Sequence, residues 1–274
     1  MEIQHPYLGT FIVVKQVGTG TFAAVYEARQ ASLNYRVAIK VFNKSFPEDD
    51  VRKAFNIASS IKHPFICQEF DLFKSQDGRL CILMEYVEGM TLLEYANNCT
   101  QIKIPELRLI IGQLIIALDY LHNKNVIHRD LKCENIIIDV NGNVRLIDFG
   151  FAGVGDLHST TCGSTEYLAP EIIKEEVYGS PIDIWSLGVV IYAIAHGELP
   201  FQNPNLTKLF HMISKLHPTF SSDEEIHPQL VDLIKQMLIK DPKKRITLKE
   251  IQDHPFFTTD DLDNHYKFDV HKYD

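Results

Sequence analysis

The segment HRDLKCEN at residues 128–135 is the most informative stretch of this chain, because it places three functional side-chain types in one short loop. Asp130 can orient a hydroxyl group and accept its proton, whereas Lys132 can neutralise the charge of a phosphate. The amide oxygen of Asn135 and the carboxylate of Asp148, which begins a DFG sequence, are ligand types that Mg²⁺ prefers. The pattern predicts a site where a hydroxyl, a phosphate and a metal ion meet; two unrelated polar turns are the plain alternative.

The hydrophobic pattern around this loop divides the chain near residues 86–90. Four stretches before that point are rich in β-forming residues and predict strands: 11–17, 24–28, 35–41 and 80–86. One helix over residues 48–62 interrupts them. Apolar residues then recur every three or four positions from 107 to 121, which predicts a long helix, and a hairpin follows with Asn141-Gly142 as its turn. Four shorter helices are predicted near 182–196, 206–215, 228–238 and 247–253.

The composition of the 274 residues, 45% hydrophobic and 23% charged, excludes a disordered or fibrous chain. The formal net charge of -9 argues against duplex DNA or an anionic membrane as the main partner. Five scattered cysteines form a poor disulfide framework and indicate a reducing compartment, and no spacing typical of a zinc site occurs. Without a signal-peptide pattern or a bilayer-length apolar run, we expect an intracellular protein of the cytoplasm or nucleus.

A glycine-rich sequence, GTGTFA at residues 18–23, lies between two predicted strands. A dinucleotide-binding fingerprint needs a helix after its glycines, and the chain holds no GxxxxGK[ST], so two common nucleotide-binding folds are disfavoured. The glycines could let a hairpin lie over phosphates, or they could serve a plain tight turn. Further on, Lys40 alternates with apolar residues, which predicts either a lysine that meets an anion or an edge-strand lysine in solvent.

Six ordered motifs resemble those of the eukaryotic protein kinase domain: GTGTFAAV, VAIK, HRDLKCEN, DFG, CGSTEYLAPE and DIWSLG. The resemblance covers roughly Tyr7 to Phe257. HRDLK is similar to the serine/threonine type, and KDPKKRITLKEIQDHPFF resembles the calcium/calmodulin-dependent and AMP-activated kinase group. The family fold is α+β and bilobal. We therefore expect a small antiparallel-sheet N-lobe with one main helix over 1–87, a larger helical C-lobe over 88–257, and an acidic, weakly ordered tail over 258–274.

The resemblance implies a role for each motif residue. Asp130 is the catalytic base, Lys132 lies near the γ-phosphate of ATP, and Lys40 contacts the α- and β-phosphates. Asn135 and Asp148 hold Mg²⁺. The other implied nucleotide contacts are Gly18, Thr19 and Gly20 over the phosphates, Val25, Ala38 and Ile137 around the ring, Met84 as gatekeeper, and the backbone of Glu85 and Val87 at the adenine. The resemblance also implies three architectural residues: Asp183, which anchors the catalytic loop, and a buried pair of Glu171 with Arg245.

Three departures from the family pattern matter. Ala23 replaces the third glycine of the loop. The helix glutamate that pairs with the strand lysine is missing, and its place is Ala54. The segment between Gly150 and Ala169 contains no Lys or Arg.

The expected function is that of a protein serine/threonine kinase that transfers the ATP γ-phosphate to hydroxyls of a protein substrate. A pseudokinase, which binds nucleotide and signals by conformation, is the first alternative because of Ala54. A small-molecule phosphotransferase is the second, and the peptide-docking motif CGSTEYLAPE opposes it. The expected catalytic domain is monomeric, with a protein substrate and an upstream kinase as partners, but no nucleic acid and no membrane.

Three further residues carry hypotheses. Thr160 lies ten residues before Pro170, the spacing of an activation-loop phosphothreonine in relatives, and Arg129 is its expected phosphate partner. Because no basic residue in the segment joins Arg129, we expect phosphorylation to stimulate modestly at most. Glu134 occupies a position that faces an upstream arginine of the substrate in relatives. Ala193 and Thr91 replace two acidic positions there, which predicts a mild preference for basic peptides.

The missing helix carboxylate leads to the last hypothesis. The chain has no acidic residue between Asp50 and Glu69, and Glu69 stands where relatives carry a leucine that packs behind the helix. We expect Glu69 to reach Lys40 over the space left at Ala54, directly or through one water. The alternative turns Glu69 to solvent by a small register shift and leaves Lys40 free or bound to Asp148.

Overall fold

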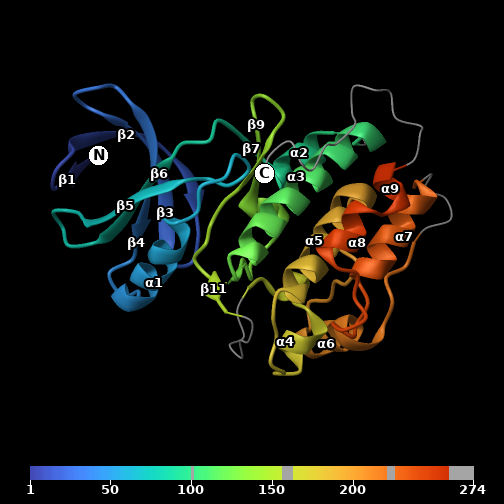
Figure 1. Ribbon diagram of the computed structural model, residues 1–274. Coiled ribbons are helices and arrows are strands. Elements are labelled where there is room, and N and C mark those ends of the chain that lie inside the picture. The colour runs from blue at the N-terminus through green and yellow to red at the C-terminus, as the bar shows by residue number, and fades with distance from the viewer. Residues whose placement is uncertain (100–101, 156–162, 221–225, 259–274) are drawn as a thin grey trace. The chain divides into compact units, whose positions relative to one another are not determined.

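The computed structural model describes residues 1–99, 102–155, 163–220 and 226–258. The chain divides into two compact units, Met1–Glu88 and Gly89–Asp274. The division falls one residue beyond the boundary expected from the sequence. The α+β class is confirmed, because the first unit is an antiparallel sheet with one helix and the second is mainly helical (Figure 1).

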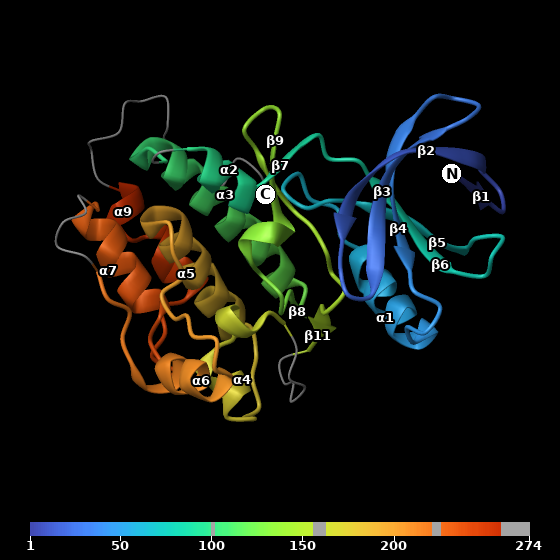
Figure 2. The ribbon, with the colours of Figure 1, turned by 180° about the vertical axis from the view of Figure 1, so that it is seen from behind.

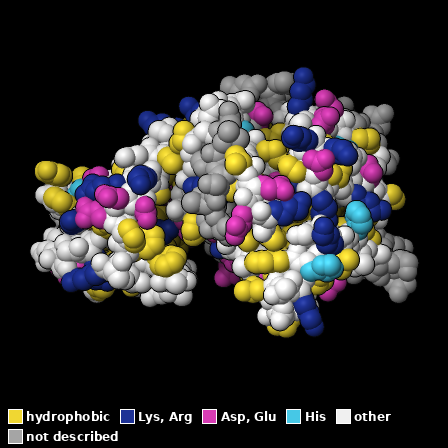
Figure 3. Space-filling model, turned by 90° about the horizontal axis from the view of Figure 1, so that it is seen from below, with side chains coloured by type: hydrophobic (Ala, Val, Ile, Leu, Met, Phe, Trp, Pro, Cys, Tyr) yellow, Lys and Arg dark blue, Asp and Glu magenta, His cyan; other side chains and the backbone are white. Residues whose placement is uncertain are grey.

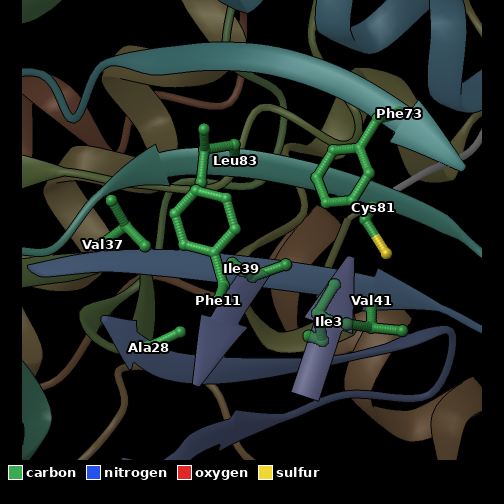
Figure 4. Close-up of a cluster of buried hydrophobic side chains, with 9 residues drawn as sticks. All are labelled: Ile3, Phe11, Ala28, Val37, Ile39, Val41, Phe73, Cys81 and Leu83. Atoms are coloured by element: carbon green, nitrogen blue, oxygen red, sulfur yellow. The ribbon is translucent and has the colours of Figure 1, made fainter. Parts of the chain in front are cut away.

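The first unit is a six-stranded antiparallel sheet in the order β1-β2-β3-β4-β6-β5. Its elements are β1 (Glu2–His5), β2 (Gly9–Thr19), β3 (Ala23–Gln30), β4 (Arg36–Phe42), α1 (Glu48–Ala58), β5 (Glu69–Lys74) and β6 (Leu80–Glu85). Alternate residues of each strand face opposite sides of the sheet. One side carries a buried apolar cluster that includes Phe11, Ile39 and Leu83 (Figure 4).

Helix α1 covers the other side of this sheet (Figures 1 and 2). Its buried Val51 belongs to a second apolar cluster with Phe42 and Ile82, against which Phe55 also packs. Three acidic residues in the first turn stabilise the helix through its dipole. The two apolar clusters give the sheet a core on both faces and leave few positions there for charge.

The second unit contains most of the helices. Its elements are β7 (Gly89–Thr91), α2 (Leu92–Asn98), α3 (Ile104–Asn123), β8 (Val126–Ile127), η1 (Cys133–Asn135), β9 (Ile136–Asp139), β10 (Val144–Leu146), β11 (Gly153–Val154), η2 (Thr165–Tyr167), α4 (Pro170–Ile173), α5 (Pro181–His196), α6 (Leu206–Lys215), α7 (Pro228–Met237), α8 (Leu248–Gln252) and α9 (Pro255–Thr258). Helix α5 is buried at every position from 182 to 192, which makes it the centre of the unit (Figure 2).

The buried ion pair of Glu171 with Arg245 is confirmed. Two hydrogen bonds of 2.7 and 2.9 Å join the guanidinium to the carboxylate, and the Arg245 side chain is 0% exposed. Such a pair resists the loss of one partner, because the other charge would stay buried and unpaired. It ties the start of α4 to the segment before α8.

The structure corrects the predicted elements in a few places. Helix α1 ends at Ala58 and not near residue 62, because Ser60 donates its backbone N–H and its hydroxyl to the Ile57 carbonyl in a tighter final turn. The sequence analysis did not predict β1, β5 or α2, nor the short elements β7, β8, β11, α4 and α9. Strand β1 is only four residues long, and its inward His5 is an uncommon core residue.

The surface of the described residues shows charges of both signs interspersed with apolar side chains on the face seen from below (Figure 3). Among these residues, no helix combines the length and apolar content needed to cross a membrane.

Candidate active site

The catalytic loop, residues 128–135, connects β8 to β9 within the second unit and includes η1. A buried carboxylate, Asp183 at the start of α5, holds its backbone in place. The amides of His128 and Arg129 donate to the two oxygens of Asp183 at 2.9 and 3.0 Å, and His122 bonds to Oδ2 at 2.8 Å. Burial alone would raise the pKa of Asp183, but these hydrogen bonds keep it below its usual value. The anchoring role predicted for Asp183 is confirmed.

Arg129 lies in the left-handed backbone region, with φ of 68°, which is costly for a residue with a side chain. Its guanidinium donates to the carbonyls of Phe151 and Ala152, the latter at 3.1 Å. The side chain therefore joins the catalytic loop to the segment that follows DFG. The left-handed backbone at Arg129 is followed by Asp130, whose side chain is buried in the unit.

The Asp130 side chain is buried, with 6% exposed, and bonds to three other residues. Its Oδ1 accepts from the amide and hydroxyl of Ser164 at 2.9 and 3.1 Å. Its Oδ2 accepts from Asn135 Nδ2 at 3.0 Å and pairs with Lys132 Nζ at 3.1 Å. Lys132 also donates to Ser164 Oγ at 2.8 Å. The structure thus places the predicted base, lysine and asparagine in one hydrogen-bonded cluster.

Ser164 was missed by the sequence reasoning as a site residue, although it belongs to the quoted motif CGSTEYLAPE. Its neighbour Gly163 explains how it reaches Asp130. Gly163 has φ of +99°, and a Cβ there would lie 2.7 Å from the Arg129 carbonyl oxygen. Only glycine permits this close approach of the two segments. The pair Gly163-Ser164 in this motif was the sequence signal that could have predicted the contact.

Asn135 and Asp148 form the candidate metal site. The Asn135 amide nitrogen donates to Asp130, which leaves its amide oxygen to serve as a ligand. The backbone N–H of Ile147 donates to the backbone carbonyl of Asn135 at 2.9 Å. Because Asp148 is the next residue after Ile147, this bond brings Asp148 close to Asn135. Asp148 has φ of 64°, and its Oδ1 accepts from the Gly150 amide at 3.0 Å.

The residues present fit Mg²⁺. Among the described residues, no group of three or more His, Cys, Asp or Glu could hold a metal. One carboxylate and one amide oxygen suit Mg²⁺, which usually completes its coordination with water and phosphate oxygens. The strained backbone at Asp148 is of the kind found where a functional side chain is aimed.

The glycine hairpin lies in the first unit, between β2 and β3. Gly20 donates its N–H to the Ala23 carbonyl at 2.8 Å and closes the turn. Neither Gly18 nor Gly20 has a positive φ, and a Cβ at either position would meet only ordinary contacts at 3.6 Å. The hairpin itself therefore does not require glycine at these two positions. The absence of side chains at Gly18 and Gly20 leaves space beside the hairpin for a bound group. This favours the interpretation in which the hairpin covers phosphates over that of a plain tight turn.

The other predicted nucleotide residues divide between the two units. The first unit carries Thr19 at the end of β2, Val25 on β3, Ala38 and Lys40 on β4, Met84 and Glu85 on β6, and Val87 after it. Val25 is opposite Lys40, and Ala38 is opposite Met84, so these four share one patch of the sheet. Ile137 lies on β9 of the second unit. Their common nucleotide site stays a prediction.

A groove of about 730 Å³ opens beside Ser164 within the second unit. Three carboxylate residues, Glu134, Glu166 and Glu198, are among its lining, together with Ala193. Thr91, the other substituted acidic position, instead caps α2 in a reciprocal pair of hydrogen bonds with Glu94. The groove is therefore acidic, and it adjoins Ser164, which bonds to the Asp130 carboxylate. Thr160 lies outside the described residues, and its role stays a prediction.

This fold and site define a class of phosphate-transferring domain. The chain matches the family model of the protein kinase domain over residues 11–257. It therefore belongs to the protein kinase domain family, whose members generally use ATP and a divalent metal.

Among curated proteins, the chain is similar to two plant kinases. The SNF1-related protein kinase catalytic subunit alpha KIN12 of Arabidopsis thaliana is 33% identical over 258 residues, which cover 91% of this chain and 52% of that protein. The carbon catabolite-derepressing protein kinase of Secale cereale is 36% identical over 270 residues, which cover 93% of this chain and 52% of that protein. The chain spans about half the length of these relatives.

Proposed function

We propose that this chain is a protein serine/threonine kinase that transfers the γ-phosphate of ATP to hydroxyl groups of a protein. One observation carries the proposal: the buried Asp130 carboxylate is held by Ser164, Lys132 and Asn135 in one network. Similarity to two plant protein kinases supports it. An intracellular location, in the cytoplasm or nucleus, and a monomeric state stay predictions.

Each residue of the site has a separate role in in-line phosphoryl transfer. The hydroxyl oxygen of the substrate forms a bond to the γ-phosphorus, the bond from that phosphorus to ADP breaks, and Asp130 accepts the hydroxyl proton. Lys132 lies 3.1 Å from Asp130, close enough to neutralise charge that develops on the transferred group. The network fixes both side chains before the substrate arrives, so little reorganisation is needed.

Asn135 and Asp148 would hold the metal ion, and Lys40 with the glycine hairpin would hold the phosphates. When bound, Mg²⁺ supplies positive charge that stabilises the phosphate oxygens. The left-handed backbone at Asp148 and its bond to the Gly150 amide fix the carboxylate for this task.

The test measures transfer of labelled γ-phosphate from ATP and Mg²⁺ to a library of serine and threonine peptides. We expect labelled peptides with the wild-type chain and none with Asp148→Asn, which also loses Mg²⁺-dependent ATP binding. Binding of ATP with no transfer to any peptide would favour the pseudokinase alternative suggested by Ala54. Turnover of a small-molecule acceptor without peptide labelling would favour the other alternative.

A further inference from the structure

Among residues 1–88, all of which the structure describes, two carboxylates are buried: Glu27 and Glu69. Glu69 begins β5 with 8% of its surface exposed, so the alternative in which it turns to solvent is wrong, and its expected reach to Lys40 stays a prediction. Glu27 lies on β3 and is 3% exposed. Because a buried carboxylate is costly unless it is paired and hydrogen-bonded, the side chains that bind Glu27 are held in one arrangement.

Arg36 on β4 is the main partner of Glu27. Its Nε lies 2.8 Å from Oε1 of Glu27, whereas Lys15 Nζ lies 3.8 Å from Oε2. The hydrogen bond from Arg36 holds the pKa of the Glu27 carboxyl below its usual value, although burial acts in the opposite direction. Glu27 is therefore the fixed point that sets where the Arg36 guanidinium lies.

The same guanidinium contacts both ends of the segment 86–88. Its central carbon lies 4.0 Å from the centre of the Tyr86 ring, and its Nη1 lies 3.1 Å from Oε2 of Glu88. Residues 86–88 follow β6 without regular secondary structure. A planar guanidinium can stack on a ring and bind two carboxylates at once, which the ammonium group of a lysine does less well. Arg36 thus joins β3 to two residues beyond the end of β6.

This network adjoins the residues predicted to contact the adenine ring. Glu27 is opposite Ala38 in the strand register, and Arg36 lies two residues before Ala38, so all three face the same side of the sheet. Val87, whose backbone is the predicted adenine contact, lies between the two residues of the segment that Arg36 binds. Movement of the segment 86–88 would therefore displace this contact.

We propose that Arg36 is a positioning residue for ATP: bound to Glu27, it holds the segment 86–88 so that the Val87 backbone is fixed where adenine binds. This role rests on the proposed kinase function, which supplies the nucleotide. Arg36 touches no reacting atom, so it acts on the affinity for ATP and not on the rate of transfer from bound ATP. A segment that is ordered in advance lowers the cost of ordering on binding.

The first experiment measures ATP affinity and turnover. Calorimetric titration with ATP and Mg²⁺ gives Kd, and peptide phosphorylation gives KM for ATP and kcat. We expect Arg36→Met to raise Kd and KM about tenfold, while kcat at saturating ATP stays within about twofold of wild type. Arg29→Met is the matched control, because Arg29 is opposite Arg36 in the register but donates to Asn34 at 3.3 Å; it should stay near wild type.

Two milder variants separate positioning from stability. Arg36→Lys keeps a positive charge beside Glu27 but loses the planar fork, and Glu88→Gln removes the outer carboxylate, whose side chain is 60% exposed. We expect both to unfold at nearly the wild-type temperature and yet to raise Kd for ATP, about fivefold and about twofold. In a chain that already carries Arg36→Met, Glu88→Gln should add nothing to Kd, because its partner is gone.

The outcomes distinguish this role from a structural one and from a failure of the proposed function. A fall in kcat that matches the loss of ATP affinity, or a Kd that follows the melting temperature across the variants, would overturn the positioning role. Additive effects of Arg36→Met and Glu88→Gln on Kd would do the same. If the wild type binds ATP and Arg36→Met binds it equally well, this proposal alone fails. If the wild type does not bind ATP, the proposed function fails with it.

Discussion

The catalytic loop around Asp130 and the sheet around Lys40 hold charged side chains in different ways. Asp130 receives its hydrogen bonds from two neighbours in the same loop, Lys132 and Asn135, and from Ser164. Lys40 lies on β4, where the register of the strand fixes the side of the sheet that each residue faces. The comparison shows that the loop gathers most of its charged groups within a few residues, whereas one inserted residue can turn a side chain to the other face of a sheet.

Removal of the Asp130 charge should give the largest effect, a loss of phosphoryl transfer without a matching loss of ATP affinity. We expect Asp130→Asn to reduce phosphoryl transfer by on the order of a thousandfold while ATP affinity changes little, because the role proposed for Asp130 is at the substrate hydroxyl. Steady-state kinetics and ATP titration measure the two effects. Asp119→Asn, which removes a carboxylate bonded to Asn123 on α3, is the matched control. Turnover of Asp130→Asn near wild type would show that the base is assigned wrongly.

A substitution of Ser164 measures how much the catalytic loop depends on this residue, which lies far from it in sequence. Ser164→Ala removes the hydroxyl bonds to Asp130 and Lys132 but keeps the backbone amide, so we expect kcat to fall about tenfold with little change in KM for ATP. Thr165→Val removes the adjacent hydroxyl, which bonds to Glu166, and should stay near wild type. Equal losses in both variants would indicate a general disturbance of the segment.

Lys240 of the second unit is a partly buried lysine whose ammonium group lies over two aromatic rings. Its Nζ lies 4.6 and 4.2 Å from the ring centres of Trp185 and Phe201 and has no hydrogen-bond partner among the described residues. Burial, with the nearby charge of Arg245, lowers the pKa of Lys240 from 10.5 to about 7.

This shift predicts how stability depends on pH. Between about pH 7 and 10.5 the unfolded chain holds a proton at Lys240 that the folded chain has lost, so stability rises with pH across that window. From pH 7 to 9 we expect a gain on the order of 1 kcal/mol after solvent screening, and Lys240→Met should abolish it. Urea unfolding at the two pH values measures the gain. An identical slope in the variant would exclude Lys240 as its source.

Glu134 should give the smallest effect. The groove contains three glutamates, but Ala193 and Thr91 stand at the two other acidic positions of relatives. We therefore expect a preference for basic peptides of only a few-fold, and Glu134→Gln should remove about half of it in free-energy terms. Peptide-library kinetics would detect this change. A strict requirement for several arginines would contradict the expectation.

The sequence predicted the grouping in the catalytic loop well, because Asp130, Lys132 and Asn135 lie within six residues and the last two both bond to Asp130. It predicted four of the six strands of the sheet, but neither β5 nor β1, where four residues around a buried histidine carry little pattern. It named Glu69 from spacing but could not tell which side it faces. That side depends on a bulge at Phe70, and no propensity distinguishes a bulged strand from a regular one. Ser164 was missed because its contact with Asp130 depends on tertiary packing.

The glycine hairpin has a consequence for how this chain can change. Because neither Gly18 nor Gly20 is needed for the turn, substitutions there should leave a folded protein while altering what the hairpin can cover. At these two positions, a substitution can therefore change nucleotide binding without changing the stability of the fold. A library that randomises both positions should yield mostly soluble variants with a wide range of ATP affinities, which makes the hairpin a suitable place to redirect the protein toward modified nucleotides.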